Sequence, residues 1–205
     1  TVLNTVSGLS FTDTALSPST SYTYSVVALD AAGNASTARS GTIATTAGGA
    51  APVAIRVNAG GPSYVDTTGK TWAADTGFNT GKTYTTTATV TNTTEPTLYK
   101  TERYQQPTDP TLVYTFSVPN GTYQVRLHFA EIYSGTKGAG LRVFDIDLES
   151  VRAFEDVDIF AQAGGGDKAL VLEKTVSVAD GNLTIGFLRQ VQNPKINAIE
   201  ILSSP

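Results

Sequence analysis

Apolar and polar residues alternate along short stretches of this chain, and glycine, proline and asparagine residues separate the stretches. The clearest stretch is 122–130, where Tyr123, Val125, Leu127 and Phe129 alternate with mostly polar side chains. Because the side chains of a β-strand point alternately to its two faces, these four residues are expected on one face. The pattern predicts a half-buried strand.

A second alternating run, 111–118, precedes this strand, and a Pro-Asn-Gly sequence at 119–121 separates the two runs. Asn-Gly between alternating runs is the strongest short-range signal for a β-hairpin. We therefore predict that 111–118 and 122–130 pair with each other. An Asp-Gly-Asn sequence at 180–182 predicts a second hairpin turn.

Between residues 53 and 203 we count about eight or nine short strand candidates, with turn signals between them. Long helical periodicities are missing, and threonine, valine, tyrosine, glycine, asparagine and aspartate are plentiful. That composition favours strands and turns over helices. The predicted fold is all-β, an antiparallel β-sandwich of the jelly-roll kind.

The first 47 residues carry a separate pattern, with strand candidates at 10–13, 21–29 and 40–45. The sequence L-x-P-x-T-x-Y-x-Y-x-V-x-A-x-D-x-x-G-N-x-S at 16–36 resembles the later half of a fibronectin type III domain. The resemblance implies that the Tyr22 hydroxyl bonds to backbone a few residues upstream. The early strands of that sandwich are missing, so we expect this partial unit to pack on a neighbouring module or another copy.

Small residues, glycines and a proline at 48–52 indicate a linker. We therefore expect a partial fibronectin type III-like unit at 1–47 and a second domain at 53–205. The chain has no methionine, so residue 1 is not a natural start. We expect a processed or excised piece of a larger protein, from which any targeting signal has been lost.

Charge and composition exclude several classes of function. The formal net charge is −4 and no basic cluster is present, which argues against nucleic acid as a partner. No run approaches the roughly 20 apolar residues that a membrane span needs, so no membrane association is expected. The chain contains no cysteine, which excludes disulfides and cysteine–zinc sites.

Catalysis by this chain is not expected, although several side chains could be considered for it. His128 is the sole histidine and lies inside a predicted strand, and no Gly-x-Ser-x-Gly motif exists; these facts disfavour a catalytic triad and a zinc site. Calcium takes oxygen ligands alone, so a structural calcium ion is left open, and no other cofactor is expected. Glycoside hydrolysis needs two carboxylates facing each other across a cleft, and spacing places no such pair among the candidates Glu102, Glu131, Asp145, Asp147, Asp156 and Asp158.

Three tyrosines, Tyr84, Tyr104 and Tyr133, fall at predicted loop or strand-end positions. A sugar ring has apolar faces and a polar rim, so a sugar site combines flat aromatic rings with carboxylate and amide groups. The alternative is that each tyrosine is a half-buried residue of the sandwich. The polar residues expected beside these tyrosines are Glu102, Glu131, Gln192 and Asn193.

Five segments, taken in order, resemble the malectin domain, which in bacteria is carbohydrate-binding module family 57. They are VNAGG (57–61), YVDTTGKTWAAD (64–75), LYKTERY (98–104), LHFAEIYSGTKGAGLRVFDIDL (127–148) and NPKINAIEI (193–201). The resemblance implies a β-sandwich that binds glucose-containing oligosaccharides in loops at one end. Aromatic residues and an acid form the family's site.

The resemblance assigns the tyrosine of the TERY motif to Tyr104 and that of the AE-aromatic motif to Tyr133, and it matches an earlier loop tyrosine to Tyr84. Two positions depart from the family. Ser134 stands where the family's lectin of the endoplasmic reticulum has phenylalanine, which removes one stacking face. Gln192 stands where the lectin has aspartate, which removes one charge.

The expected function is therefore that of a non-catalytic carbohydrate-binding module for a neutral, glucose-containing glycan. Bacterial relatives accompany secreted carbohydrate-active enzymes beside fibronectin type III modules, so we expect a bacterial protein, secreted or at the cell surface. The module would direct an appended enzyme or a surface protein to its glycan. Two alternatives stay open, a structural or protein-interaction spacer between neighbouring modules and a hydrolase.

Overall fold

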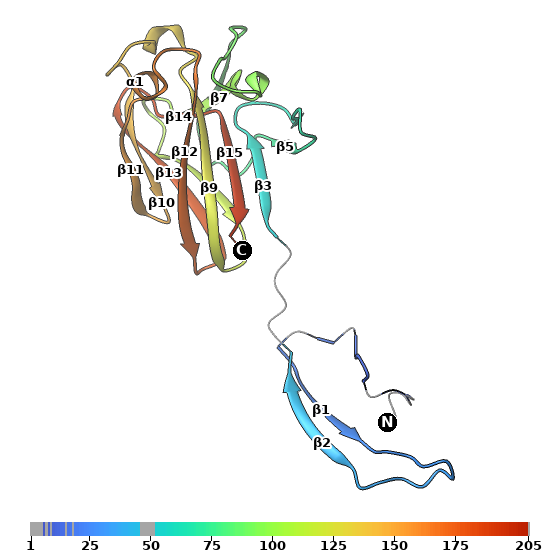
Figure 1. Cartoon of the computed structure of the whole chain (residues 1–205). Helices are drawn as coiled ribbons and strands as arrows, with labels where there is room; N and C mark the ends of the chain where they lie inside the picture. Colours follow the sequence, from blue (N-terminus) through green and yellow to red (C-terminus); the bar gives the residue numbers. More distant parts are fainter. Residues whose placement is uncertain are drawn as a thin grey trace. The chain divides into compact units, whose positions relative to one another are not determined.

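The computed structural model describes residues 6, 8, 10–14, 16–17, 19–45 and 52–204. The chain divides into two compact units, Thr1–Ala51 and Pro52–Pro205 (Figure 1). Of the predicted linker, only Pro52 belongs to the described residues.

In the first unit, β1 (Ser21–Val26) pairs antiparallel with β2 (Arg39–Ala44). The Ser17 amide donates a hydrogen bond to the Tyr22 hydroxyl over 2.9 Å, which is the type of bond expected there. The predicted strand at 10–13 does not form, and the described residues of this unit contain one two-stranded sheet. Within the described part of this unit no second sheet covers the ribbon, and Val26 and Ile43 stay 68% and 64% exposed.

The second unit contains a six-stranded and a four-stranded sheet, and every strand pair in them is antiparallel except β3 with β5. In spatial order, the first sheet contains β12 (Ala169–Val178), β9 (Gly121–Ala130), β15 (Ala198–Ser203), β3 (Ala54–Asn58), β5 (Thr71–Ala74) and β4 (Tyr64–Val65). The second contains β11 (Val151–Val157), β10 (Val143–Leu148), β13 (Asn182–Val191) and β8 (Leu112–Ser117). The unit is an all-β sandwich, as the sequence predicts.

The two predicted hairpins are wrong. Strand β8 pairs with β13, whereas β9 pairs with β12 and β15 in the other sheet. The Asn-Gly turn therefore carries the chain across the sandwich, and the turn at 180–182 does the same between β12 and β13. The physical reason is burial: an arch turns the apolar faces of its two strands toward each other, while a hairpin points both in the same direction.

The core between the sheets is built from these alternating faces. Tyr123, Val125, Leu127 and Phe129 of β9 are all buried in it, as predicted. Phe129 contacts Phe144 from the opposite sheet at a ring-centroid distance of 5.9 Å. Each such side chain contributes about 1.5–3 kcal/mol by leaving water, so the register of β9 is fixed.

A second, smaller core covers the outer face of the six-stranded sheet at one end. Trp72 and Tyr99 pack edge-on against His128 of β9, with centroid distances of 5.3 and 5.8 Å. Asp66 accepts a hydrogen bond from the Trp72 indole N–H over 3.1 Å. This cluster anchors the segment that leads into a small third sheet.

The third sheet has three strands, in the order β14 (Lys195–Ile196), β7 (Thr101–Tyr104) and β6 (Lys82–Thr85). Three short helices complete the unit: η1 (Pro96–Tyr99), η2 (Ser134–Thr136) and α1 (Ile159–Ala163). Over the described ranges, no helix combines the length and the apolar character that crossing a membrane requires.

Candidate functional site

A pocket of about 220 Å³ lies beside the three-stranded sheet. Six of the seven predicted site residues line it, and Arg142 joins them. The lining residues are Tyr84, Glu102, Tyr104, Tyr133, Arg142, Gln192 and Asn193.

Strand pairing explains why residues far apart in the sequence meet here. In the β6–β7 pair, Tyr84 lies opposite Glu102 and Lys82 lies opposite Tyr104. On the other side of β7, Lys195 of β14 also lies opposite Tyr104. Directly paired residues and residues two apart share one face of a sheet, so all five side chains belong to the face on which the pocket opens.

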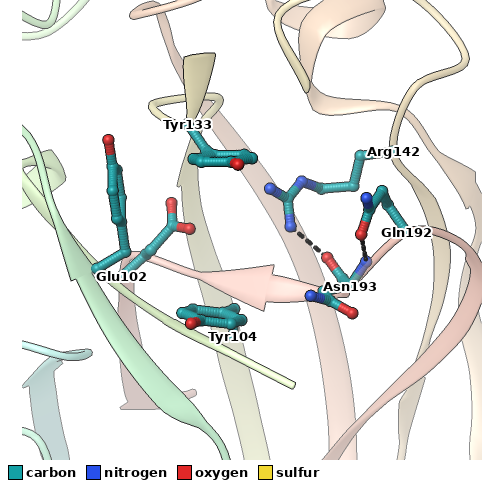
Figure 2. Close-up of a pocket in the computed structure, with 7 residues that line it drawn as sticks. Glu102, Tyr104, Tyr133, Arg142, Gln192 and Asn193 are labelled. Carbon is teal, nitrogen blue, oxygen red and sulfur yellow. Dashed lines mark hydrogen bonds between the residues drawn. The ribbon is translucent and has the colours of Figure 1, made fainter. Parts of the chain in front are cut away.

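The tyrosine rings form the walls. Tyr133 precedes η2 and stays 44% exposed, and its ring meets that of Tyr84 edge-on at 5.5 Å between centroids. Figure 2 shows the rings of Tyr104 and Tyr133 facing each other across the pocket. Glu102 lies at one edge of the gap between them, and Asn193 lies at the other.

Glu131 is the predicted site residue that does not line the pocket. It is fully buried and forms an ion pair with Arg142, with 2.7 Å between Oε2 and Nε. Its other oxygen accepts hydrogen bonds from the Thr136 hydroxyl over 2.7 Å and the Tyr133 amide over 3.3 Å. Glu131 therefore holds the Tyr133 loop from behind, and it does not offer its carboxylate to a solute.

Glu102 reaches the pocket with its charge already balanced. Its Oε2 lies 2.8 Å from Lys195 Nζ, and both side chains are buried. Lys195 also donates to Asn197 Oδ1 over 2.6 Å and to the Ala130 carbonyl. Burial lowers the pKa of Lys195, and the Glu102 carboxylate opposes this shift.

Gln192 and Asn193 form a short loop at the far edge of the pocket. Gln192 has a backbone φ of +60°, and its side-chain oxygen accepts a hydrogen bond from the Asn193 amide over 3.2 Å. Arg142 donates through Nη1 to the Asn193 carbonyl (Figure 2). The guanidinium of Arg142 thus ties this loop to Glu131.

Arg142 is the lining residue that sequence reasoning missed. A signal for it existed, because a glutamate flanked by apolar residues in the Ala-Glu-Ile-Tyr motif needs a cationic partner when it is buried. The sequence does not say which of the chain's cations fills that role. The partner lies eleven residues further on, after a glycine-rich loop.

The other carboxylates considered for hydrolysis lie away from the pocket. Asp145 and Asp147 both form ion pairs with Arg152 on the four-stranded sheet. The distance from Arg152 Nε to Asp147 Oδ1 is 2.6 Å. Asp145 also accepts a hydrogen bond from the Asp156 amide over 2.9 Å. Asp158 caps α1. Among the residues lining the pocket, Glu102 is therefore unopposed by a second carboxylate.

His128 belongs to the smaller core and not to the pocket. Its Nδ1 lies 2.8 Å from the Tyr99 hydroxyl. Burial, together with the nearby Arg126 charge, lowers the pKa of His128 to about 4. Within the described ranges, no group of three His, Cys, Asp or Glu side chains could hold a metal ion.

Comparison with known proteins gives this architecture a family context. A family model described as the malectin domain matches residues 53–199. Receptor-like protein 4 of Arabidopsis thaliana is 41% identical over 111 residues, which cover 51% of this chain and 17% of that protein. The chain thus spans less than a fifth of the length of that relative.

Solved structures show the same fold. The plant receptor-like kinase FER superposes with a TM-score of 0.67 at 24% identity, over 73% of this chain and 48% of that chain. Bacteroides uniformis β-glucuronidase superposes with a TM-score of 0.66 at 19% identity, over 86% of this chain and 22% of that chain.

The expectation of a bacterial protein is corrected by the sequence relatives. Besides receptor-like protein 4, they include a putative receptor-like protein kinase of Arabidopsis thaliana, 38% identical over 72 residues. The signal behind that expectation was the pairing of a malectin-like sequence with a fibronectin-like one, and such a pairing does not identify an organism.

Proposed function

This chain belongs to the malectin-domain family, and we propose that its pocket binds a neutral glycan without cleaving it. The relatives are receptor-like proteins, and this domain, like theirs, lies outside the cell or at the cell surface. Its role would be to bring the larger protein that carries it to a sugar.

The observation that carries this proposal is the pair of facing rings, Tyr104 and Tyr133, with polar groups at the edges of the gap (Figure 2). A pyranose presents C–H groups on its two faces and hydroxyl groups around its rim. The rings would cover the faces, and Glu102 and Asn193 would meet the rim. A ring with equatorial substituents, such as glucose, fits between two flat walls better than one with axial hydroxyls.

The charges of the site favour a neutral ligand. Glu102 is balanced by Lys195 and Glu131 by Arg142, and Gln192 contributes no charge. A charged sugar would gain no free partner from these pairs and would lose its hydration on entry. The balanced charges of the pocket therefore support a neutral glycan as the ligand.

The size of the pocket sets the scale of affinity. About 220 Å³ is less than the roughly 300–1,000 Å³ of a pocket for a drug-sized ligand. One or two sugar rings would fill it. A dissociation constant of roughly micromolar to millimolar, about −8 to −4 kcal/mol, follows for so small a contact.

A non-catalytic role is supported by the arrangement of the carboxylates. Hydrolysis of a glycosidic bond requires two carboxyl groups about 5–10 Å apart on either side of the bond. In the pocket Glu102 faces tyrosine and amide side chains. Glu131 is held behind the wall by Arg142.

A spacer function is the second candidate, and the first unit favours it. The Ser17–Tyr22 hydrogen bond and the β1–β2 ribbon agree with the later half of a fibronectin type III-like unit. Val26 and Ile43 give that ribbon apolar surface that a neighbouring module could cover. In this case the chain would separate or orient modules, and the pocket would be unused.

The test is glycan retention by the purified chain on a broad glycan array, followed by titration calorimetry. Tyr104→Ala and Tyr133→Ala should each weaken binding roughly tenfold or more, with unchanged circular dichroism. Tyr22→Ala removes a tyrosine of the other unit and should bind like the unaltered chain. Normal retention by both pocket variants would rule out this site, and an array without hits would favour the spacer.

A further inference from the structure

Gly135 lies directly against the ring of Tyr133, which forms one wall of the pocket. A Cβ added at Gly135 would stand 2.6 Å from Tyr133 Cε1, 3.1 Å from Cζ and 3.3 Å from the hydroxyl oxygen. The first of these distances is shorter than Cβ atoms in proteins essentially ever show. The ring therefore lies where it does because residue 135 has no side chain.

Backbone conformation does not require glycine at this position. Gly135 lies in η2, and its φ is not among the positive values that favour glycine. The residue is also exposed, so an added methyl group needs no space in the core. The three heavy atoms nearest to the added Cβ all belong to Tyr133. The close approach of that ring is thus what the missing side chain permits.

The backbone around Gly135 is held by hydrogen bonds, so an added methyl group would displace the ring and not the loop. The Thr136 amide donates to the Tyr133 carbonyl over 3.1 Å, and the Gly138 amide donates to the Thr136 carbonyl over 2.9 Å. The Thr136 hydroxyl donates to the buried Glu131 over 2.7 Å. The tyrosine ring is the end of a side chain and can turn about its own bonds.

A displaced Tyr133 ring would change both contacts that define this side of the pocket. It meets Tyr84 edge-on at 5.5 Å between centroids, and it faces Tyr104 across the gap (Figure 2). A sugar between two flat rings is held by dispersion contacts with both of them. A radial gap of about 0.5–1 Å already removes a quarter to a half of such a contact. Small displacements of the ring should therefore weaken binding.

We propose that Gly135 is a positioning residue of the pocket. Its missing side chain lets the Tyr133 ring lie where it faces Tyr104, and this sets the gap that receives the sugar ring. The inference rests on the proposed glycan binding. Gly135 is not among the residues that line the pocket, so a side chain at this position acts on the sugar through Tyr133.

The test is a double-mutant cycle measured by titration calorimetry. Maltose, nigerose, cellobiose and laminaribiose are titrated into the unaltered chain, and the tightest binder is used for the variants. Gly135→Ala should bind it about fivefold more weakly or worse. In a Tyr133→Ala background the same change should cause no further loss, because the ring on which it acts is gone.

Gly121→Ala is the matched control. Gly121 begins β9, its φ is not among the positive values either, and the atom nearest to an added Cβ is 3.9 Å away. A methyl group there displaces nothing, so this variant should bind the chosen disaccharide like the unaltered chain.

Two measurements without sugar separate positioning from a structural role. Gly135→Ala should melt no lower than the unaltered chain, because alanine restricts the unfolded chain and the ring yields in the folded one. The NMR shifts of the ring protons of Tyr84 and Tyr133 should change in Gly135→Ala, because the two rings are in contact. The same shifts should stay unchanged in Gly121→Ala.

The outcomes distinguish this inference from glycan binding itself. If none of the four disaccharides binds the unaltered chain, glycan binding fails and the inference fails with it. If a disaccharide binds the unaltered chain and Gly135→Ala equally, the role of Gly135 is wrong while glycan binding stands. A loss of affinity that persists in the Tyr133→Ala background also overturns it, as does a lowered melting temperature with unchanged ring-proton shifts.

Discussion

Lys195 Nζ lies 2.8 Å from Glu102 Oε2, and the two side chains are 0% and 2% exposed. They meet because Lys195 pairs with Tyr104 across β14 and β7, and Glu102 lies two residues before Tyr104 on the same face. A buried carboxylate of this kind is tolerated when a cation and further hydrogen bonds balance it. The ion pair as a whole is neutral, so the pocket contains a carboxylate whose charge is balanced by Lys195.

Replacing Lys195 by methionine should destabilise the fold strongly. The change keeps most of the side-chain volume and leaves Glu102 buried with no cation. Breaking a buried ion pair by removing one partner costs about 3–5 kcal/mol. Urea unfolding followed by tryptophan fluorescence measures this, since Trp72 is the sole tryptophan and is buried.

Two variants serve as controls for that result. Lys82→Met removes the exposed lysine on the other side of Tyr104 and should change stability by no more than about 0.5 kcal/mol. Adding Glu102→Gln to Lys195→Met should recover part of the loss, because it removes the unpaired charge. A Lys195→Met chain as stable as Lys82→Met contradicts the role given to the ion pair.

Gly60 is a position where close packing excludes a side chain. Its φ is +72°, and a Cβ there would lie 2.2 Å from the carbonyl oxygen of Glu102. Gly60→Ala should therefore lower the free energy of unfolding by about 3 kcal/mol, from backbone strain and displacement of β7 together.

Gly69 provides the comparison for Gly60. It has a similar φ of +83°, and a Cβ there would meet no atom within 4 Å. Gly69→Ala should cost about 1–2 kcal/mol, from the left-handed backbone alone. Equal melting temperatures for the two variants would mean that the contact with Glu102 is not important.

Alternation along the chain predicts which face of a strand is buried, because that pattern depends on the strand's own residues. Leu127 and Phe129 point into the core between the sheets as expected. The partner of a strand depends on distant residues, and the Asn-Gly sequence at 119–121 does not contain that information. The turn forms an arch because β8 pairs with β13 in one sheet, while β9 pairs with β12 and β15 in the other.

In the candidate site, too, local sequence motifs predict some residues, while others depend on contacts that form only in the folded chain. The family resemblance brings Tyr84, Tyr104 and Tyr133 to one pocket, and the structure gathers them there. Their roles in binding stay predictions. Arg142 escaped prediction because the burial of Glu131, which requires it, is a property of the folded loops.

Stability should fall between pH 6.5 and pH 4 through His128. Its pKa is about 4 in the folded protein, below the ordinary 6.5, because of burial and the Arg126 charge. The unfolded chain therefore binds more protons across this window, so stability is full above pH 6.5 and is lost as pH falls toward 4. The full effect is about 3 kcal/mol.

His128→Gln isolates that contribution, because His128 is the sole histidine. Glutamine can still meet the Tyr99 hydroxyl, and it does not titrate. Unfolding by urea at half-unit pH steps should show a slope in the unaltered chain that is largely missing from the variant between pH 5 and pH 6.5. If the free energy of unfolding depends on pH in the same way in both proteins, His128 is not a buried, neutral imidazole in the folded chain.

Arg142→Lys should weaken sugar binding while keeping the charge. Arg142 donates to Glu131, to Thr136 and to the carbonyl of Asn193, and a lysine ammonium cannot span these three acceptors in one plane. We expect a loss of about 2 kcal/mol in unfolding free energy, as for one or two charge-assisted hydrogen bonds. Glycan affinity should fall as well, because the loop of Asn193 is released.

Arg152→Lys is the matched control for Arg142→Lys. Arg152 likewise contacts more than one acceptor, here the carboxylates of Asp145 and Asp147, but its side chain is 35% exposed on the four-stranded sheet. Surface ion pairs contribute about 0–1 kcal/mol, so this variant should lose little stability and no affinity in calorimetric titration. If Arg142→Lys binds sugar as tightly as Arg152→Lys, the guanidinium does not position the pocket, and the loop of Asn193 must hold its shape through Gln192 and Pro194 alone.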